Sequence, residues 1–264
     1  MRRADLVFFH SSSRARSMHA ELALLEAASP QQARKHSDGM DADKASRWLT
    51  PELRAEYERD GYVVMRGYLT ASEVELVRTE ADRAMVGFEW YPGFEGTRKN
   101  VQLGDVFFGA QLIKGAHVPI LTALVGHDLV PSTCAFFDKP LEKSNPIEPH
   151  RDGGGPMDGA TIWMALDAAD ASNGCLHYTP GSHRTVDPSL PAYAPPPQGR
   201  TGGVAVPVQP GDVIVHSARC IHYSEQASVP RRRRAVSYFY WSGATARELE
   251  AKGQSVPGGW ASLS

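Results

Sequence analysis

Cysteine and unbalanced charge are both scarce in this sequence. Its 264 residues include three cysteines, Cys134, Cys175 and Cys220, which lie far apart and form no CxxC pair. This small, odd number argues against a disulfide scaffold or a zinc site, and we expect reduced thiols in a cytoplasmic protein. The 28 basic and 30 acidic side chains leave a net charge of -2. Because no strong field of one sign remains, we expect no nucleic-acid partner and no attraction to an anionic membrane.

Long apolar stretches are also scarce, and we expect none to approach the ~20 residues that a membrane span requires. The apolar run at residues 6–9 is too short for a secretory signal. With 42% hydrophobic residues, the chain can bury one sizeable core. We predict an N-terminal extension over residues 1–45, in which partial disorder is compatible with the polar composition, and a single domain over residues 46–264. We expect a monomer or a homodimer.

Helical signals come first along the domain, and strand signals follow. Thr50 and Pro51 can begin a helix that Gly61 ends, and Thr70 with Glu73 forms a capping box for a second helix. From about residue 130, short β-branched and aromatic runs alternate with turn residues, a pattern typical of a sandwich or barrel. The strands expected there are 133–137, 161–166, 175–179, 204–208, 213–215 and 235–241. Two further segments, the aromatic 88–112 and the proline-rich 188–203, are expected to be loops that border a site.

A histidine and an aspartate stand two residues apart in the sequence Glu148-Pro149-His150-Arg151-Asp152. In a strand, residues i and i+2 point to the same side, so His150 and Asp152 would present an imidazole and a carboxylate together. These are two thirds of the two-histidine, one-carboxylate set that holds iron(II) and leaves positions open. The second histidine must come from a distant strand. His222, His216, His177 and His183 all compete for this role.

The residues after His222 favour it as the second histidine. Arg233 follows eleven residues later, at the start of an expected strand, and Ser224 follows two residues later. A guanidinium can bind a carboxylate through two parallel hydrogen bonds. Arg233 could therefore hold the distal carboxylate of 2-oxoglutarate, with the Ser224 hydroxyl facing the same way.

Three segments carry a resemblance to a known family. They are YERDGYVVMRGYLTASEVELVR, HRDGGGPMDGATIWMALDAADASNGCLHYTPGSHR and GDVIVHSARCIHYSEQASVPRRRRAV. Together they resemble the phytanoyl-CoA dioxygenase family over roughly residues 50–241. The resemblance implies a mainly β fold with flanking helices, a double-stranded β-helix of the jelly-roll, cupin-like kind. It also implies that Asn173, Gly174, Pro180 and Gly181 form turns.

The resemblance further assigns roles to site residues. It places iron(II) on His150, Asp152 and His222, and 2-oxoglutarate on Arg233 and Ser224. Lys139, in the sequence FDKP, matches a lysine that some family members place near this co-substrate. Trp163 could line the cavity, although an inward aromatic side chain on a barrel strand more often serves packing.

The expected function is that of a dioxygenase that uses iron(II), 2-oxoglutarate and O2. We expect hydroxylation of an unactivated C–H bond of a small molecule, for example in natural-product metabolism, with release of succinate and CO2. A halogenase is not expected, because Asp152 occupies the position that chloride would need. Two alternatives stay open: a cupin-like metal-binding protein or isomerase, and an oxygenase that gives desaturation or cyclisation.

Overall fold

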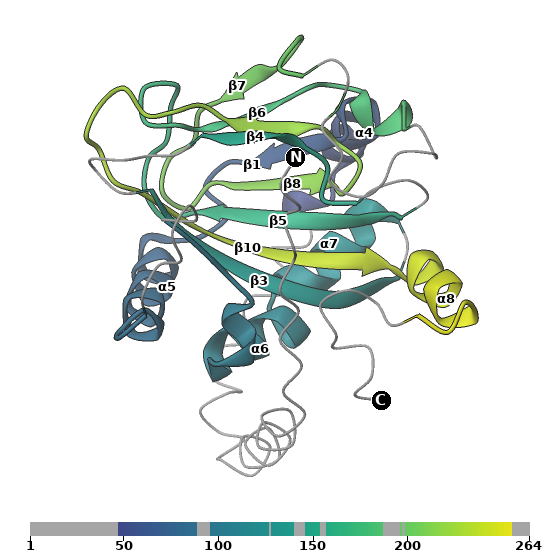
Figure 1. The fold of residues 1–264 in the computed structure, drawn as a ribbon, viewed down its shortest axis with the longest axis horizontal. Coiled ribbons are helices and arrows are strands. Elements are labelled where there is room, and N and C mark those ends of the chain that lie inside the picture. The colour runs from purple at the N-terminus through teal and green to yellow at the C-terminus, as the bar shows by residue number, and fades with distance from the viewer. Residues whose placement is uncertain are drawn as a thin grey trace, which may run out of the picture. The chain divides into compact units, whose positions relative to one another are not determined.

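Two antiparallel β-sheets enclose the core of the protein (Figure 1). The structure is a computed structural model, and it describes residues 47–88, 96–126, 128–139, 146–153, 157–186, 196 and 199–254. The expected N-terminal extension therefore lies outside the described residues. The fold class predicted from the sequence, a mainly β jelly roll with flanking helices, is confirmed.

The larger sheet has six strands in the order β1-β8-β5-β10-β3-β2, and the smaller sheet has four in the order β4-β9-β6-β7. The strands of the larger sheet are β1 (Tyr62–Met65), β2 (Thr97–Lys99), β3 (Leu129–Lys139), β5 (Gly159–Ala165), β8 (Val213–Ser217) and β10 (Arg233–Ser242). Those of the smaller sheet are β4 (Ile147–His150), β6 (Leu176–Tyr178), β7 (Val204–Val206) and β9 (His222–Ser224). Each run expected to be a strand overlaps one of these elements.

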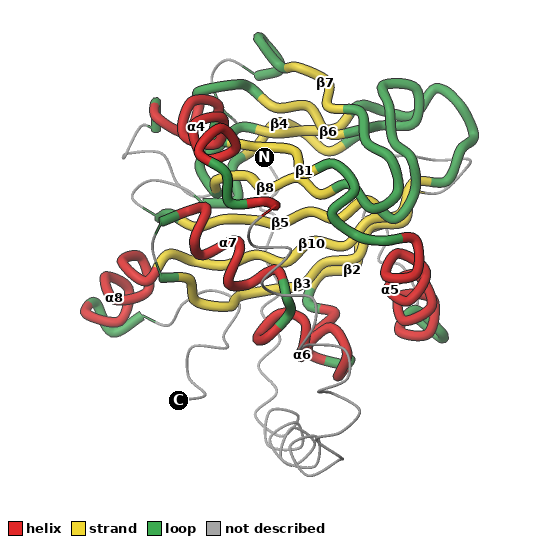
Figure 2. The backbone as a smooth tube through the Cα atoms, turned by 180° about the vertical axis from the view of Figure 1, so that it is seen from behind, coloured by secondary structure: helices red, strands yellow, loops and turns green. Residues whose placement is uncertain are grey.

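Helices flank the larger sheet, as the view from behind shows (Figure 2). They are α4 (Pro51–Asp60), α5 (Ala71–Ala84), α6 (Val106–Lys114), α7 (His117–Val125) and α8 (Gly243–Ala251), with short 3-10 helices η1 (Val101–Leu103) and η2 (Ser182–Arg184). Helix α6 contacts β3, and α7 contacts β5. On the helix side, Tyr240 of β10 meets His117 of α7, whose Nε2 lies 2.8 Å from the tyrosine hydroxyl. Because side chains alternate along a strand, Arg233 and Ser237 of β10 point the other way, between the sheets.

The core between the sheets draws apolar side chains from both of them. Its buried members are Trp163, Ala165, Ala169, Cys175, Leu176, Tyr178, Val206, Val208, Ile214, Cys220 and Ala235. All three cysteines are free and buried, as the sequence predicts. The candidate functional site lies beside this core, on the same inner faces.

Helix α4 is closed at both ends as its sequence predicts. The Thr50 side chain accepts a hydrogen bond from Leu53 N, and Gly61 adopts a left-handed conformation with φ 81°. The loop that holds Pro180 and Gly181 covers the C-terminal end of α4. His183 Nε2 lies 3.2 Å from the carbonyl oxygen of Glu58, to which Arg184 also donates at 3.1 Å. His183 therefore caps the C-terminal end of α4.

The aromatic segment 88–112 is not a single loop, contrary to the prediction. Its described part folds into β2, η1 and most of α6, and residues 89–95 lie outside the described residues. Phe108 is fully buried in α6. Its apolar side chain is therefore committed to packing behind the sheet, where it cannot cover a site between the two sheets.

The expectation that no apolar stretch is long enough to cross a membrane was also wrong. By length and composition alone, the 20-residue stretch Val106–Val125 is long and apolar enough to cross a membrane. Gly115 divides this stretch into α6 and α7, each of nine residues. Their buried side chains include Phe108, Leu112 and Leu121, so the apolar character is explained by packing against the larger sheet.

Candidate functional site

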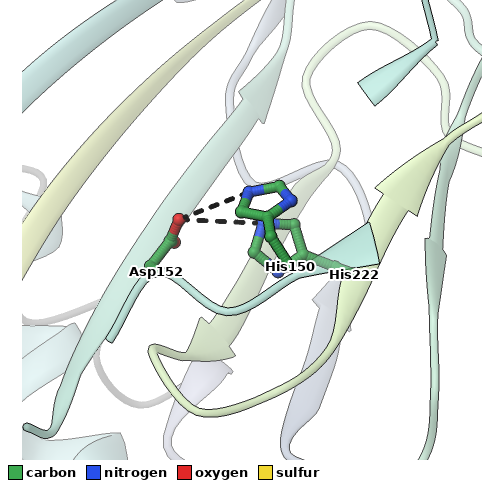
Figure 3. Close-up of side chains that lie close together, drawn as sticks. All are labelled: His150, Asp152 and His222. Atoms are coloured by element: carbon green, nitrogen blue, oxygen red, sulfur yellow. Dashed lines mark ion pairs between the residues drawn. The ribbon is translucent and has the colours of Figure 1, made fainter. Parts of the chain in front are cut away.

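Two histidines and an aspartate from separate parts of the chain come together between the sheets. The nearest ligand atoms of His150, Asp152 and His222 all lie within 4.8 Å of one another. His150 ends β4 and pairs directly with His222 at the start of β9. Figure 3 shows the Asp152 carboxylate facing both imidazoles, with Oδ1 3.7 Å from His150 Nε2 and 3.8 Å from His222 Nε2. The arrangement can hold one cation.

Asp152 reaches this position by a route other than the predicted strand alternation. Strand β4 ends at His150, so Asp152 lies in the bend that follows. Two contacts tie this bend to the segment before His222. Gly153 N donates to the carbonyl oxygen of Ala218 at 2.8 Å, and Arg151 Nε donates to that of Arg219, also at 2.8 Å. The main chain of residues 218–219 thus fixes where the carboxylate lies.

Both histidines are prepared to bind a cation through Nε2. The Nδ1 atom of His150 lies 2.8 Å from the carbonyl oxygen of Glu148, and that of His222 lies 3.0 Å from that of Cys220. A carbonyl can only accept, so each Nδ1 carries the proton and each Nε2 has a free lone pair. Burial, and then the neighbouring imidazole, lowers the pKa of both histidines to about 4. They are therefore neutral at physiological pH, as metal ligands must be.

The carboxylate of Asp152 supplies the negative charge of the cluster. Burial by itself would raise its pKa, but the His222 charge and the contact with His216 outweigh burial and hold the pKa well below the usual value. Two neutral imidazoles and one carboxylate are the ligand set typical of iron(II) sites with open positions.

Two other histidines considered as ligands, His216 and His177, have different surroundings. Both ring nitrogens of His216 have partners, since Nε2 lies 3.1 Å from Asp152 Oδ2 and Nδ1 lies 2.9 Å from the hydroxyl of Tyr178. His177 neighbours Tyr178 on β6 and so points to the opposite face, where its ring stacks on Tyr223.

A buried cation without a counter-ion lies beside this cluster. Arg233 is 0% exposed, and among the described residues none of its three guanidinium nitrogens has a hydrogen-bond partner. The buried hydroxyl of Ser224 also lacks one. Burial lowers the pKa of Arg233 only to about 10, so it stays charged at neutral pH. An unpaired buried charge is costly unless a partner is bound, so these two groups fit a carboxylate ligand.

Lys139 adds a second positive group next to Arg233. The two residues pair across β3 and β10. Lys139 is buried, and its Nζ donates to the carbonyl oxygen of Glu225 at 3.3 Å. Burial, and then the Arg233 charge, lowers the pKa of Lys139 to about 7. The ring of Trp163 closes the other side, with its centroid 5.0 Å from Arg233 Cζ.

Lys99 is a charged residue at the site that the sequence reading did not identify. It pairs with Ala135 at the edge of the larger sheet. Its neighbour Arg98 bonds to Ala84 and Met85 behind the sheet, so Lys99 points to the inner face, and its charge helps to lower the pKa of His150 and His222. Nothing in the sequence marks so short an edge strand. The alternation in Thr97-Arg98-Lys99 becomes informative only once the strand is known.

The described end of the proline-rich loop lies next to the strands that carry the ligands. Arg200 Nη2 donates to Glu148 Oε1 at 3.0 Å, and Arg200 Nη1 donates to Glu225. Glu148 belongs to β4, and Glu225 follows β9 directly. The described end of the segment expected to border the site therefore lies next to the strands that carry His150 and His222, while its residues 188–195, 197 and 198 lie outside the described residues.

Comparisons with known proteins agree with this geometry. A protein from Dictyostelium discoideum, the phytanoyl-CoA dioxygenase domain-containing protein 1 homolog, is 24% identical over 74% of this chain and 92% of its own length. The carbocyclase SnoK from nogalamycin biosynthesis is 22% identical with a TM-score of 0.66, over 81% of this chain and 93% of SnoK. The epimerase SnoN from the same biosynthesis is 27% identical with a TM-score of 0.63, over 72% and 82%. The family model for phytanoyl-CoA dioxygenase matches residues 57–235. The chain therefore belongs to the phytanoyl-CoA dioxygenase family.

Proposed function

We propose that this protein is an iron(II)- and 2-oxoglutarate-dependent oxygenase that hydroxylates a C–H bond of a small molecule. The observation that carries the proposal is the pairing of two incomplete sites: a cluster of two histidines and a carboxylate, and beside it a buried arginine without a counter-ion. The first lacks a cation and the second lacks an anion. SnoN, which is similar to this chain, has been crystallised with Fe3+ and alpha ketoglutarate.

In this proposal the chain's own residues bind and orient the reactants. His150, Asp152 and His222 hold the iron, and Arg233 with Ser224 binds the distal carboxylate of 2-oxoglutarate. Lys139 adds positive charge at that end. Trp163, which is 3% exposed, covers the guanidinium and keeps water from it. When bound, iron(II), 2-oxoglutarate and O2 supply an oxidation that breaks a substrate C–H bond and releases succinate and CO2.

A second outcome, ring closure or epimerisation, is favoured by the similarity to the carbocyclase SnoK and the epimerase SnoN. These reactions also begin with removal of a hydrogen atom from the substrate, so the ligand set does not separate them from hydroxylation. A cupin-like binding protein or isomerase would have no use for the Arg233 pocket. Natural-product metabolism and a cytoplasmic location, as monomer or homodimer, belong to the same proposal.

Anaerobic titration with iron(II) and then 2-oxoglutarate tests the proposal directly. The wild-type protein should develop the weak visible charge-transfer band of an iron–oxo-acid chelate. His150→Ala and His222→Ala should each lose most iron binding, because a site with three protein ligands cannot easily spare one. His177→Ala is the matched control and should behave as wild type. Retention of the band in both ligand variants would contradict the metal assignment.

The reaction type is tested by product analysis. A screen for succinate release across classes of small molecules identifies a substrate, and mass spectrometry of the product follows. A gain of 16 Da, one oxygen atom, indicates hydroxylation. A loss of two hydrogens indicates desaturation or ring closure, and an unchanged mass with altered retention indicates epimerisation. Either of the last two results would replace hydroxylation as the proposed outcome.

A further inference from the structure

The two oxygens of the Asp152 carboxylate have different surroundings. Oδ1 faces the imidazoles of His150 and His222, at 3.7 and 3.8 Å. Oδ2 faces away from them and has two other partners, Thr161 Oγ1 at 2.6 Å and His216 Nε2 at 3.1 Å. An ionised carboxylate can only accept hydrogen bonds, so the Thr161 hydroxyl and an Nε2–H of His216 both donate to Oδ2.

The hydroxyl of Tyr178 determines which nitrogen of His216 carries the proton. With the proton on Nε2, the Nδ1 of neutral His216 is an acceptor, and the Tyr178 hydroxyl lies 2.9 Å from it. Tyr178 is 0% exposed, and its ring stacks on Tyr62 with centroids 4.4 Å apart. Burial raises the pKa of Tyr178 well above its usual value, so the hydroxyl keeps its proton and can donate. The result is a chain of hydrogen bonds from Tyr178 through His216 to Asp152.

This chain of hydrogen bonds links three strands and both sheets. Tyr178 lies on β6 of the smaller sheet, while His216 lies on β8 and Thr161 on β5 of the larger sheet. Thr161 and His216 are direct partners in the register of β5 and β8. The two donors to Oδ2 are therefore held side by side by the sheet itself, and Tyr178 reaches them from the opposite sheet.

We propose that His216 is a positioning residue that, oriented by Tyr178 and assisted by Thr161, presents only Oδ1 of Asp152 to the metal ion. The two in-plane lone pairs of Oδ2 are already engaged by the two donors, which disfavours bidentate coordination. Asp152 then takes up one coordination position, and the remaining positions stay available for co-substrate and dioxygen. The proposal rests on the metal assignment made under Proposed function.

The test is a double-mutant cycle on iron affinity. His216→Phe removes the donor and keeps an aromatic ring, and Tyr178→Phe removes only a hydroxyl. Tyr62→Phe is the matched control, because it removes a hydroxyl from the ring stacked on Tyr178. Iron(II) affinity is measured anaerobically by competition with a chelator. The thermal unfolding midpoint of each metal-free protein is measured in parallel.

We expect His216→Phe to weaken iron binding about 10–100-fold, the range typical of lost partners of metal ligands. Tyr178→Phe should weaken it less, because His216 can still donate to Asp152 in one of its two tautomers. The double variant should match His216→Phe alone, since Tyr178 acts only through His216. Tyr62→Phe should bind iron as the wild type does. His216→Gln, which restores a donor, should recover part of the affinity and guards against a folding defect in His216→Phe.

Three results would overturn the proposal and can be told apart. Wild-type iron affinity in His216→Phe, with loss in His222→Ala, removes the role of His216 and leaves the proposed function standing. Additive effects of His216→Phe and Tyr178→Phe, together with lowered unfolding midpoints, indicate a purely structural role. If His216→Phe loses all iron binding while His222→Ala binds iron as the wild type does, His216 is a ligand and the metal assignment itself is overturned.

Discussion

Arg233 is the residue whose burial is hardest to explain without a ligand. The neighbouring arginines each have a carboxylate partner: Arg232 donates to Asp138 at 2.7 Å, and Arg234 donates to Asp167 at 2.9 Å. Of this run, Arg233 points between the sheets, and it has no acidic partner in the part of the chain that the structure describes. The RRRR sequence therefore combines surface ion pairs with one inward charge, as strand alternation requires.

Replacing Arg233 with Met should separate stability from binding. The metal-free variant should unfold at the wild-type temperature or above it, because an apolar side chain of similar length removes an unpaired buried charge. The affinity of the iron-loaded protein for 2-oxoglutarate should fall by about 2–5 kcal/mol, the usual loss for one partner of an enclosed charge pair. Calorimetry measures both quantities. Arg232→Met is the control and should leave 2-oxoglutarate affinity unchanged; equal losses in the two variants would argue against the carboxylate pocket.

Lys139 should make 2-oxoglutarate binding depend on pH near neutrality. Burial and the Arg233 charge lower its pKa from 10.5 to about 7. The pKa of Lys139 is lower in the folded than in the unfolded state, so burying the charged ammonium lowers the free energy of unfolding. This destabilisation is absent above pH 10.5 and complete below about 7. A dicarboxylate prefers the ammonium form. Its affinity should therefore fall as pH rises through 7, by no more than about tenfold per pH unit.

The control for this pH dependence is a residue that keeps its charge. Lys139→Arg should bind 2-oxoglutarate with little change between pH 6.5 and 8.5, because a guanidinium stays protonated throughout. Lys139→Met should bind more weakly and also without pH dependence. A slope in Lys139→Met equal to that of the wild type would assign the titration to another group.

At the scale of single elements, the sequence predicted best where the chemistry is local. The caps at Thr50 and Thr70 and the closing glycine at Gly61 were all read correctly, because a cap depends on residues within one turn. The bend that holds Asp152 was misread as strand. Its shape depends on hydrogen bonds to residues 218–219, which no local pattern encodes. The short edge strand β2 was missed for the same reason.

Gly61 ends helix α4 and lies against His183 of η2. Gly61→Ala should therefore destabilise the fold. Its φ of 81° is unfavourable for alanine, and a Cβ there would collide with the imidazole of His183. Gly67→Ala is the matched control, since Gly67 has φ 66° but nothing within 4 Å of the added atom. The control should lose only the ~1–2 kcal/mol of a left-handed residue, and Gly61→Ala should lose clearly more. Urea denaturation measures both; equal losses would show that His183 moves away freely.

At the scale of the whole molecule, the sequence singled out the three side chains that the structure brings together, but not the residues that hold them in place. His150 and His222 could be paired in advance because the motif spacing and the Arg233 position are strong signals. The sequence could not show that Thr161 and His216 bond to Asp152, because the register between β5 and β8 brings these two residues together. The aromatic segment 88–112 was expected to be a loop bordering the site because of its composition, but Phe108 is buried in packing behind the sheet.

Binding of both ligands should stabilise the whole domain. A ligand that binds only the folded state raises the free energy of unfolding by about 2.7 kcal/mol at 100 times its Kd. Iron(II) with 2-oxoglutarate should therefore raise the unfolding temperature, measured anaerobically by scanning calorimetry. In Arg233→Met, iron alone should still raise it, and the same concentration of 2-oxoglutarate should add much less than in the wild type. A rise equal to that of the wild type would place 2-oxoglutarate binding elsewhere.

The order of strands in the larger sheet has a consequence for synthesis of the protein. Strand β10, which lies between β5 and β3, comes later in the sequence than the other strands of the described residues. A ribosome makes the two flanking strands first, and neither can pair with its missing neighbour until residues 233–242 have left the exit tunnel. During that interval both strands expose unpaired edges, which are prone to non-native pairing. The larger sheet therefore closes from the middle, and only after residues 233–242 have joined it.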